Sequence, residues 1–516
     1  MLAAEAVMPG PKKDEERGDL TRRSLGAFKW NALGSLARVG AQFLIGVLLA
    51  RLLGPEPFGL VAIAWLLLGL GNLVADFGLA AALIQRPTVS DRDIRYAFTL
   101  QMLSGLLLAA LVAGTAPLIS AFFNRPDAEP VLQAMSLVFV LQAGGQTASA
   151  LLRREMNFRA VQVASVGSYV IGFLLVGVPM AFGGYGVWAL VGAVLTQSAL
   201  YTLALLVQKR HAKRPSLAAE NPGMLSFGGG VLAGNLTSWS ISNLDAALVG
   251  RLIGVTELGL YNRTMNLVAT PMNAFTTALQ GVLFSAYSRA QQDIAAVRGA
   301  YLGSLGVVAV LLVPVFAALA AVPQTAILGV YGEAWLPAAA ILTPLALAMP
   351  VNALLAMGGP LLLGLGKAGR EAGAQAVGAV VLIIAVWLAA GISLAAVAWA
   401  VFAVYLLRLL LVTRLALGMC QGKWGAAGKS VVGPVCLGIL SAFSANACES
   451  LLAHEVPVAT LRLLIDLVVA GGVCLLVLLL AGRYLLAAET VAAMLKGSQR
   501  LPVALQNTVR RWERSA

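Results

Sequence analysis

Hydrophobic residues follow one another along most of this chain in long runs, which are separated by short polar breaks. A run of about 20 apolar residues is long enough to cross a hydrocarbon core of about 30 Å as a helix. The polar breaks therefore predict an all-α polytopic membrane protein with about 14 membrane helices. These cover residues 26–53, 57–84, 96–123, 129–152, 160–182, 187–208, 224–253, 258–285, 299–322, 337–362, 373–391, 394–417, 430–449 and 457–482.

Composition supports this fold class over a large soluble helical protein. The 516 residues are 59% hydrophobic and 11% charged, and the mean hydropathy is +0.85. A soluble domain carries about twice that share of charged residues. Its helices would also need charged outer faces, which this sequence lacks. Because residues 1–24 are polar and charged, we expect no cleavable signal peptide.

The basic residues gather in alternate gaps between the predicted helices. Most of the 36 Lys and Arg residues lie in the N-terminal tail, in 85–95, 153–159, 209–214, 289–298, 367–370 and 408–429, and in the tail from Arg483. The opposite gaps hold only Arg125. By the positive-inside rule, both termini are expected in the cytoplasm. The formal charge of +13 then reflects orientation and contact with anionic lipids, and no nucleic-acid partner is expected.

A ten-residue phrase occurs twice, as RLLGPEPFGL from Arg51 and as RLIGVTELGL from Arg251. The copies fall at the ends of the first and seventh predicted helices. In each copy the two glycines, Gly54 with Gly59 and Gly254 with Gly259, are expected to bracket a short turn. Equivalent positions in two halves of equal orientation predict two parallel six-helix repeats, followed by two more helices.

This plan divides the chain into six segments. They are a cytoplasmic tail at 1–24, an N-terminal lobe of helices 1–6 at 25–208, a cytoplasmic linker at 209–223, a C-terminal lobe of helices 7–12 at 224–417, helices 13 and 14 at 418–482, and a basic cytoplasmic tail at 483–516.

Polar residues inside membrane segments are costly, so they usually face a cavity or a neighbouring helix. Three predicted helices carry them at spacings of mostly 3 and 4 on one face. They are Asn31, Ser35, Arg38 and Gln42 in the first helix, Asn235, Ser238 and Ser242 in the seventh, and Arg263, Asn266, Thr270, Asn273, Thr277 and Gln280 in the eighth. We predict that these faces line a substrate cavity. Hydrogen bonds between helices, worth about 0.6 kcal/mol each, are the alternative.

Arg38 is the sharpest candidate, because it lies about 15 Å along its helix at about 1.5 Å per residue. A guanidinium near the middle of the membrane is suited to grip a diphosphate or an acidic sugar through two parallel hydrogen bonds. An ion pair with Asp76, or a contact with a carbonyl group, is the structural alternative. Arg263 and Asp245 lie at similar depth, where a salt bridge and a substrate role are equally open. Asp76 and Asp245 are also candidates to bind H⁺ or Na⁺.

Three arginines, Arg153, Arg154 and Arg159, cluster at a predicted cytoplasmic helix end. They are candidates to capture a diphosphate from the cytoplasm, and topology signals meeting anionic headgroups are the alternative. The stretch GKWGAAGKS at 422–430 is similar to a phosphate-binding loop, but its first glycine lies one residue too early for GxxxxGK followed by Ser or Thr, and no strand is predicted before it. We therefore expect ion or potential gradients to supply the energy.

Several stretches carry a family resemblance: ARLLGPEPFGLVAIA with DFGLAAALIQR, TASALLRREMNFRAVQVASVGSYVIG, GGYGVWALV and GRLIGVTELGLYNRT. Through them the chain resembles flippases of the multidrug/oligosaccharidyl-lipid/polysaccharide superfamily, and within it the Wzx-type lipopolysaccharide and exopolysaccharide exporters. The resemblance covers most of residues 25–290, and the last third matches only in hydropathy. It implies a V-shaped pair of six-helix lobes in the inner membrane. It also implies that undecaprenyl-diphosphate-linked oligosaccharide is flipped to the outer leaflet, beside a polysaccharide polymerase and export proteins.

Two other functions compete with this one. A cation-coupled multidrug exporter of the same superfamily would line its cavity with carboxylates and aromatic rings, whereas these helices carry amides, hydroxyls and arginines. A membrane glycosyltransferase or polymerase would need long outer loops with catalytic residues, and the longest outer gap, 323–336, carries only Glu333 as an ionisable acid. We therefore expect no enzyme activity, no catalytic residue, no cofactor and no metal site.

Overall fold

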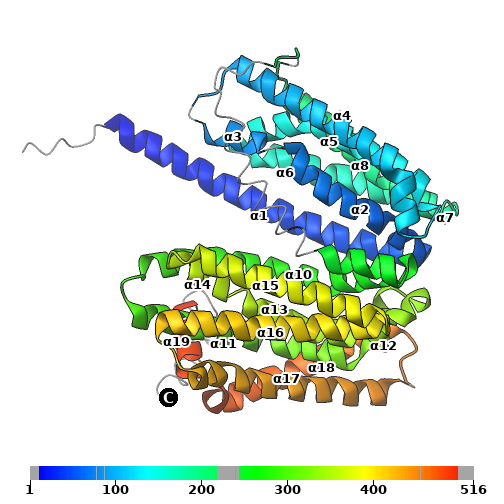
Figure 1. Cartoon of the computed structure of the whole chain (residues 1–516). Helices are drawn as coiled ribbons and strands as arrows, with labels where there is room; N and C mark the ends of the chain where they lie inside the picture. Colours follow the sequence, from blue (N-terminus) through cyan, green and yellow to red (C-terminus); the bar gives the residue numbers. More distant parts are fainter. Residues whose placement is uncertain are drawn as a thin grey trace, which may run out of the picture. The chain divides into compact units, whose positions relative to one another are not determined.

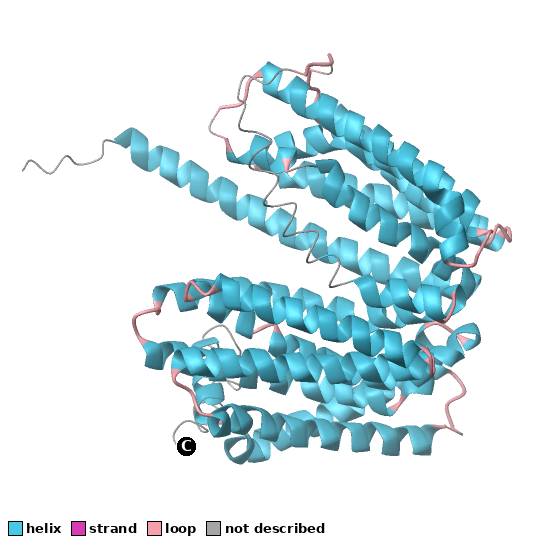
Figure 2. Cartoon of the chain, viewed as in Figure 1, coloured by secondary structure: helices cyan, strands magenta, loops and turns pink. Residues whose placement is uncertain are grey.

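The computed structural model describes residues 11–76, 78–86, 88–212, 214–217, 239, 243–453 and 455–497. Regular structure in these residues is helical throughout, and they contain no strand (Figure 2). The chain forms two compact units, Met1–Ser242 and Asn243–Ala516, which we call the N-terminal unit and the C-terminal unit. The predicted all-α fold is confirmed.

The N-terminal unit begins with one long helix, α1, over Pro11–Leu53. This helix therefore starts within the residues that the sequence assigns to a cytoplasmic tail. The other helices follow in chain order: α2 (Pro55–Asp76), α3 (Leu79–Gln85), α4 (Asp91–Phe122), α5 (Ala128–Arg154), α6 (Phe158–Tyr169), a π-helical stretch (Val170–Gly177), α7 (Val178–Phe182) and α8 (Val187–Gln208). Ser90 and Asp93 form a reciprocal capping box at the start of α4.

The C-terminal unit starts with helical residues 243–252, which are the end of the predicted seventh helix. The remaining elements are α10 (Val255–Arg289), α11 (Ile294–Ala321), α12 (Pro323–Val330), a 3₁₀ turn (Glu333–Ala338), α13 (Ala339–Leu355), α14 (Gly358–Gly364), α15 (Ala368–Ala390), α16 (Leu394–Cys420), α17 (Trp424–Leu452), α18 (Ala459–Leu485) and α19 (Ala488–Gly497). The short helix α19 lies in the predicted C-terminal tail.

Twelve helices in the described part of the chain are long and apolar enough to cross a membrane. Each coincides with one of the predicted segments. The two segments without such a helix are the second, where α2 is apolar over Pro55–Gly71, and the seventh, most of which lies outside the described residues. The described helices are therefore consistent with about fourteen membrane helices.

The duplicated phrase marks an equivalent break in both units. Gly54 separates α1 from α2 with a left-handed φ of 71°, and Gly254 separates residues 243–252 from α10. Glycine adopts such a φ at no steric cost. Gly59 and Gly259 do not bracket the turn as predicted, because both are buried inside the helix that follows it. The first turn is thus Gly54 alone and the second is Ile253 with Gly254, and neither is a longer loop.

The second predicted segment, 57–84, is not one continuous helix. It is broken at Gly78, whose φ of 71° ends the α-helical path before α3 begins. A hydropathy pattern cannot show this break, because the residues on both sides of it are equally apolar.

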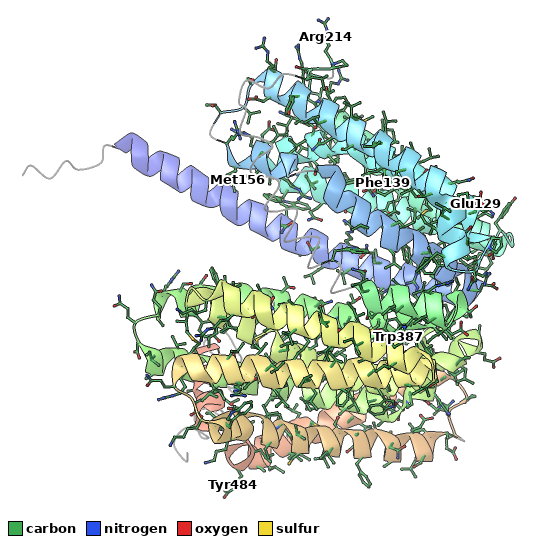
Figure 3. The ribbon with its side chains drawn as sticks, in the orientation of Figure 1. Glu129, Phe139, Met156, Arg214, Trp387 and Tyr484 are labelled. Atoms are coloured by element: carbon green, nitrogen blue, oxygen red, sulfur yellow. The ribbon has the colours of Figure 1, made fainter. Side chains whose placement is uncertain are left out.

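Each unit is built around its most enclosed helices. In the N-terminal unit α5 packs against α2, α3, α4 and α8, and 61% of its apolar window is buried. Phe139 of α5 lies inside this bundle (Figure 3) and is 1% exposed. In the C-terminal unit α11 and α13 are buried to the same degree. There α17 and α18 lie on the side of the unit opposite to α10 (Figure 1).

Candidate functional site

A polar cavity of about 220 Å³ lies within the N-terminal unit, between α1, α5, α6 and α8. Its lining residues are Arg38, Gln142, Gly145, Gln146, Ser149, Arg153, Ser165, Gln197, Ser198 and Tyr201. Two are arginines, most others carry an amide or hydroxyl group, and none is acidic. The cavity therefore presents positive charge and hydrogen-bond donors, which is the chemistry that recognises phosphate and sugar oxygens.

Arg38 reaches this cavity from α1. Its guanidinium is half-buried, and Nη1 donates a hydrogen bond to the Ser165 hydroxyl on α6 at 2.7 Å. A guanidinium has five N–H donors, so this bond fixes the side chain and leaves donors for a ligand. Asp76, the alternative partner, ends α2, and its side chain lies outside the described residues.

The three arginines of the cytoplasmic cluster lie in different surroundings. Arg153, at the end of α5, lines the cavity together with Arg38. Arg154 donates to the carbonyl oxygens of Leu83 and Arg86 at 2.7 and 2.5 Å, and so caps the end of α3. The guanidinium carbon of Arg159 lies 5.0 Å from the ring centre of Trp30, in a cation–π contact between α6 and α1.

The other predicted residues of α1 lie outside the cavity lining. Asn31 is exposed, and its Oδ1 accepts a hydrogen bond of 2.9 Å from Gln162 on α6. Close packing supports this contact, since a Cβ at Gly34 would lie 2.5 Å from Cβ of Gln162. Gln42 is exposed, and Asn235 lies outside the described residues. Asn31 thus connects helices, as the alternative interpretation of the polar face allowed.

The polar face of α10 lies in the C-terminal unit. Some of its side chains are exposed and others contact neighbouring elements. Asn266 and Asn273 are exposed, and the Asn266 amide donates to the Asn262 carbonyl of its own helix at 2.8 Å. The Gln280 amide donates to the Ala356 carbonyl after α13 at 3.0 Å, which connects two helices. Arg263 is half-buried, and its carbonyl accepts a hydrogen bond of 3.2 Å from the Tyr331 hydroxyl.

Asp245 is almost completely buried in the C-terminal unit. Its Oδ2 accepts a 2.7 Å hydrogen bond from the Tyr261 hydroxyl, and its Oδ1 accepts one of 2.8 Å from the Ala246 amide. These two donors satisfy both carboxylate oxygens, so Asp245 has a structural connection to α10 in addition to its predicted role as an ion-binding candidate.

Several polar residues were missed from the sequence, although a signal existed for some of them. Gln142, Gln146 and Ser149 recur on α5 at spacings of 4 and 3, which is the same pattern used to select α1 and α10. Gln197 and Tyr201 are likewise spaced by 4 on α8. Helices α5 and α8 each contribute more polar residues to the cavity lining than α1 does.

Arg408 is a second omission, because the predicted helix 394–417 and the basic gap 408–429 overlap at this residue and it is not among the site candidates. Arg408 lies well inside α16, which continues to Cys420. Its Nη2 donates to Oε1 of Gln375 at 2.7 Å, and the Gln375 amide donates to Oε1 of Glu371 at 3.0 Å. This chain of hydrogen bonds ties α16 to α15 and places a cation close to a carboxylate.

Comparison with known proteins decides the family. Residues 48–340, more than half of the chain, match the family described as polysaccharide biosynthesis protein. The chain belongs to this family. The resemblance to Wzx-type polysaccharide biosynthesis proteins is confirmed. Arg38 precedes the matched residues and α17 and α18 follow them, so the match itself says nothing about their roles.

Two curated relatives of this polysaccharide biosynthesis protein are similar over most of its length. Lipopolysaccharide biosynthesis protein WzxC of Escherichia coli (strain K12) is 27% identical over 320 residues, covering 61% of this chain and 65% of the relative. Succinoglycan biosynthesis transport protein ExoT of Rhizobium meliloti (strain 1021) is 28% identical over 319 residues, covering 62% of this chain and 64% of ExoT. The chain thus spans just under two thirds of the length of these relatives.

Solved structures show the same fold at low sequence identity. Lipid II flippase MurJ, in an inward closed conformation, has a TM-score of 0.68 at 12% identity, covering 86% of this chain and 97% of MurJ. An inward-facing multidrug resistance transporter of the MATE family has a TM-score of 0.59 at 16% identity, covering 76% of this chain and 94% of the transporter. The fold is therefore shared by transporters with different cargo.

Proposed function

We propose that this protein flips undecaprenyl-diphosphate-linked oligosaccharide units from the cytoplasmic to the outer leaflet by alternating access. The product would supply export of an exopolysaccharide, capsule or O-antigen. The observation that carries the proposal is the cavity of the N-terminal unit, which has two arginines, an amide-rich lining and no acidic residue. The names of the relatives, which describe biosynthesis and transport of lipopolysaccharide and succinoglycan, support the same class of cargo.

The size of the cavity indicates which part of the cargo it binds. Pockets for drug-sized ligands usually have volumes of about 300–1,000 Å³, and this one has about 220 Å³. It suits a diphosphate with the adjoining sugar better than a whole oligosaccharide. Arg38 and Arg153 would grip the diphosphate oxygens, and the glutamine amides would bind sugar hydroxyls. Asn266 and Asn273 of the C-terminal unit are further candidates for sugar contacts.

The energy for this movement would come from gradients. Transfer of negative charge out of a cell with a negative interior is downhill by about 2.3 kcal/mol per charge per 100 mV. H⁺ or Na⁺ at Asp76 or Asp245 would add to this driving force. The flippase would lie in the inner membrane. The positive-inside rule supports an orientation with both termini in the cytoplasm and basic loops against anionic lipids. Cysteine labelling at Glu56 and Glu257 should report the outside, and labelling at Ser90 and Ser216 the inside.

A cation-coupled multidrug exporter is the second candidate, because a MATE transporter shares the fold. A cationic drug is disfavoured by the two arginines of the cavity, since like charges repel in a low-dielectric site. A polysaccharide polymerase and export proteins would be the functional partners of the flippase, and a multidrug exporter would need neither.

The deciding experiment uses the full chain in liposomes with a fluorescent undecaprenyl-diphosphate-linked saccharide. Replacement of Arg38 by Ala should lower the flipping rate by roughly 10- to 100-fold, since a hydrogen bond to a charged group contributes about 1.5–3 kcal/mol. Lys should restore it only in part, because it lacks the planar fork. Arg289→Ala, at the exposed end of α10, is the matched control. Full activity of Arg38→Ala protein, or flipping that requires ATP hydrolysis by this chain, would refute the proposal.

A further inference from the structure

The helix pair α17 and α18 contains an ionic cluster that lies apart from the cavity lining. Glu449 comes from α17, Arg462 and Asp466 come from α18, and Thr325 comes from α12. Asp466 lies about 10 Å along α18 from Ala459, at about 1.5 Å per residue, inside the apolar window. Ionisable residues at such a depth are expensive and usually mark a functional site.

One carboxylate of this cluster is held in place and the other is not. Oε1 of Glu449 accepts a 2.6 Å hydrogen bond from the Thr325 hydroxyl and lies 3.2 Å from Nη1 of Arg462. Among the described residues, Oε2 of Glu449 has no hydrogen-bond partner. Asp466 is 0% exposed, and neither of its carboxylate oxygens has a partner there either. The cluster therefore holds three buried acceptor oxygens that need a donor, beside one buried N–H group without an acceptor, Nε of Arg462.

The charges of the cluster indicate what that donor is. Two carboxylates and one guanidinium leave one negative charge in an apolar helix pair, and a single added positive charge would cancel it. The side chains that act directly on Asp466 are Cys448, Glu449 and Arg462. Helix α12 contributes Thr325 but no ionisable group, and the part of α11 over 311–321 is entirely apolar. Among the described residues, Arg462 is the only cation that acts on Asp466.

We propose that Asp466 and Glu449 form a proton-binding site in the α17–α18 pair. Asp466 carries the proton, and its carboxylic O–H donates a hydrogen bond to the unpartnered Oε2 of Glu449. Thr325 and Arg462 hold Glu449 as the ionised acceptor. A proton fits better than a metal ion, because hard cations such as Ca²⁺ take about six to eight oxygen ligands. The described residues hold no group of three or more His, Cys, Asp or Glu that suits a metal.

The test uses wild-type protein in liposomes and dicyclohexylcarbodiimide, an apolar reagent that modifies protonated carboxyl groups. Mass spectrometry of the digested protein locates the modified residue. We expect modification at Asp466 that falls as the buffer is made alkaline and that is lost in Asp466→Asn. Asp127→Asn, which removes an ion-paired carboxylate outside the membrane helices, should leave this modification unchanged.

Three results would overturn the proposal. The first is the absence of modification at both Asp466 and Glu449 in folded wild-type protein at every pH. The second is undiminished modification of Glu449 in Asp466→Asn protein, because Asp466 would then not be the proton carrier. The third is protection by Na⁺ at constant pH, which would assign the site to a metal cation. The wild-type measurement does not depend on whether any variant folds.

Discussion

The third membrane helix of each six-helix repeat has different surroundings in the two units. In the N-terminal unit this helix is α4, with 22% of its apolar window buried, whereas its counterpart α11 in the C-terminal unit has 61% buried. The difference arises because α17, α18 and α19 pack against α11, and α4 has no such cover among the described residues. The additional helices thus convert a lipid-facing helix into an interior one.

The polar chemistry of the two units differs in a related way. The arginines of the N-terminal cavity have no carboxylate beside them in the lining, whereas in the C-terminal unit Arg408 is connected through Gln375 to Glu371 and Arg462 contacts Glu449. A cation that is already neutralised has little attraction left for an anionic ligand. The N-terminal cavity therefore fits the proposed diphosphate site better than these C-terminal clusters do, and the C-terminal clusters fit the proposed proton site better.

The largest expected effect comes from giving the N-terminal cavity a carboxylate of its own. In Gln146→Glu, a negative charge of nearly the same shape would neutralise Arg38 or Arg153 and repel the diphosphate. Flipping of the lipid-linked saccharide in liposomes should fall by roughly 10- to 100-fold, equivalent to about 1.5–3 kcal/mol. Gln133→Glu, an exposed position on the same helix, adds the same charge outside the cavity and should change the rate little. Equal losses in both variants would contradict the assignment of the cavity.

The second prediction concerns the cover over α11. A Cβ at Gly433 of α17 would lie 1.7 Å from the Leu485 carbonyl oxygen of α18, so Gly433→Ala must separate the two helices. Such overpacking costs about 1–3 kcal/mol, and we expect a lower Tm in detergent. In α4, a Cβ at Gly114 meets no atom within 4 Å. Gly114→Ala should leave the Tm unchanged or raise it, since Ala favours a helix by about 1 kcal/mol over Gly.

The positions of the membrane helices could be predicted from the sequence because long apolar runs require membrane burial whatever they pack against. The helix break at Gly78 could not, because it depends on a local backbone angle. The interactions of Arg408 could not either, because the sequence places it both in the predicted helix 394–417 and in the basic gap 408–429. The site was predicted in part. Arg38 and Arg153 do line one cavity, but Asn31 and Gln280 connect helices, since spacing shows which residues share a face and not what that face contacts.

A smaller effect should sharpen the contrast at α11 itself. The buried hydroxyl of Ser441 on α17 donates to the Pro314 carbonyl of α11 at 2.8 Å, whereas Ser444 donates to Leu440 within its own helix. A hydrogen bond between membrane helices contributes about 0.6 kcal/mol on average. Ser441→Ala should therefore lower the free energy of unfolding by about that amount, and Ser444→Ala by less. If the two variants lose equal stability, the Ser441 bond does not help to hold α17 against α11.

The smallest expected effect lies in the loop between α4 and α5, at the N-terminal unit's break near Gly54. Arg125 pairs there with Glu56 and Asp127, at 2.5 Å in each case. The hydrogen bonds from Arg125 lower the pKa of Asp127 below its ordinary value of 3.8. A lowered carboxyl pKa means that the stabilisation is present above the ordinary pKa and is lost as the pH falls through the folded-state value. Because Asp127 is half exposed, water and salt weaken the pair.

Thermal unfolding across acidic pH at low salt should detect this contribution. The Tm of wild-type protein should fall more steeply on acidification than that of Asp127→Asn, and the difference should shrink at high salt. The C-terminal unit supplies the control, since Glu257 follows Gly254 at the equivalent break and forms no ion pair with a described residue. Glu257→Gln should therefore leave the slope unchanged. A slope that responds equally to both substitutions would mean that Arg125 does not distinguish the two breaks, and that the N-terminal loop keeps its shape through the backbone alone.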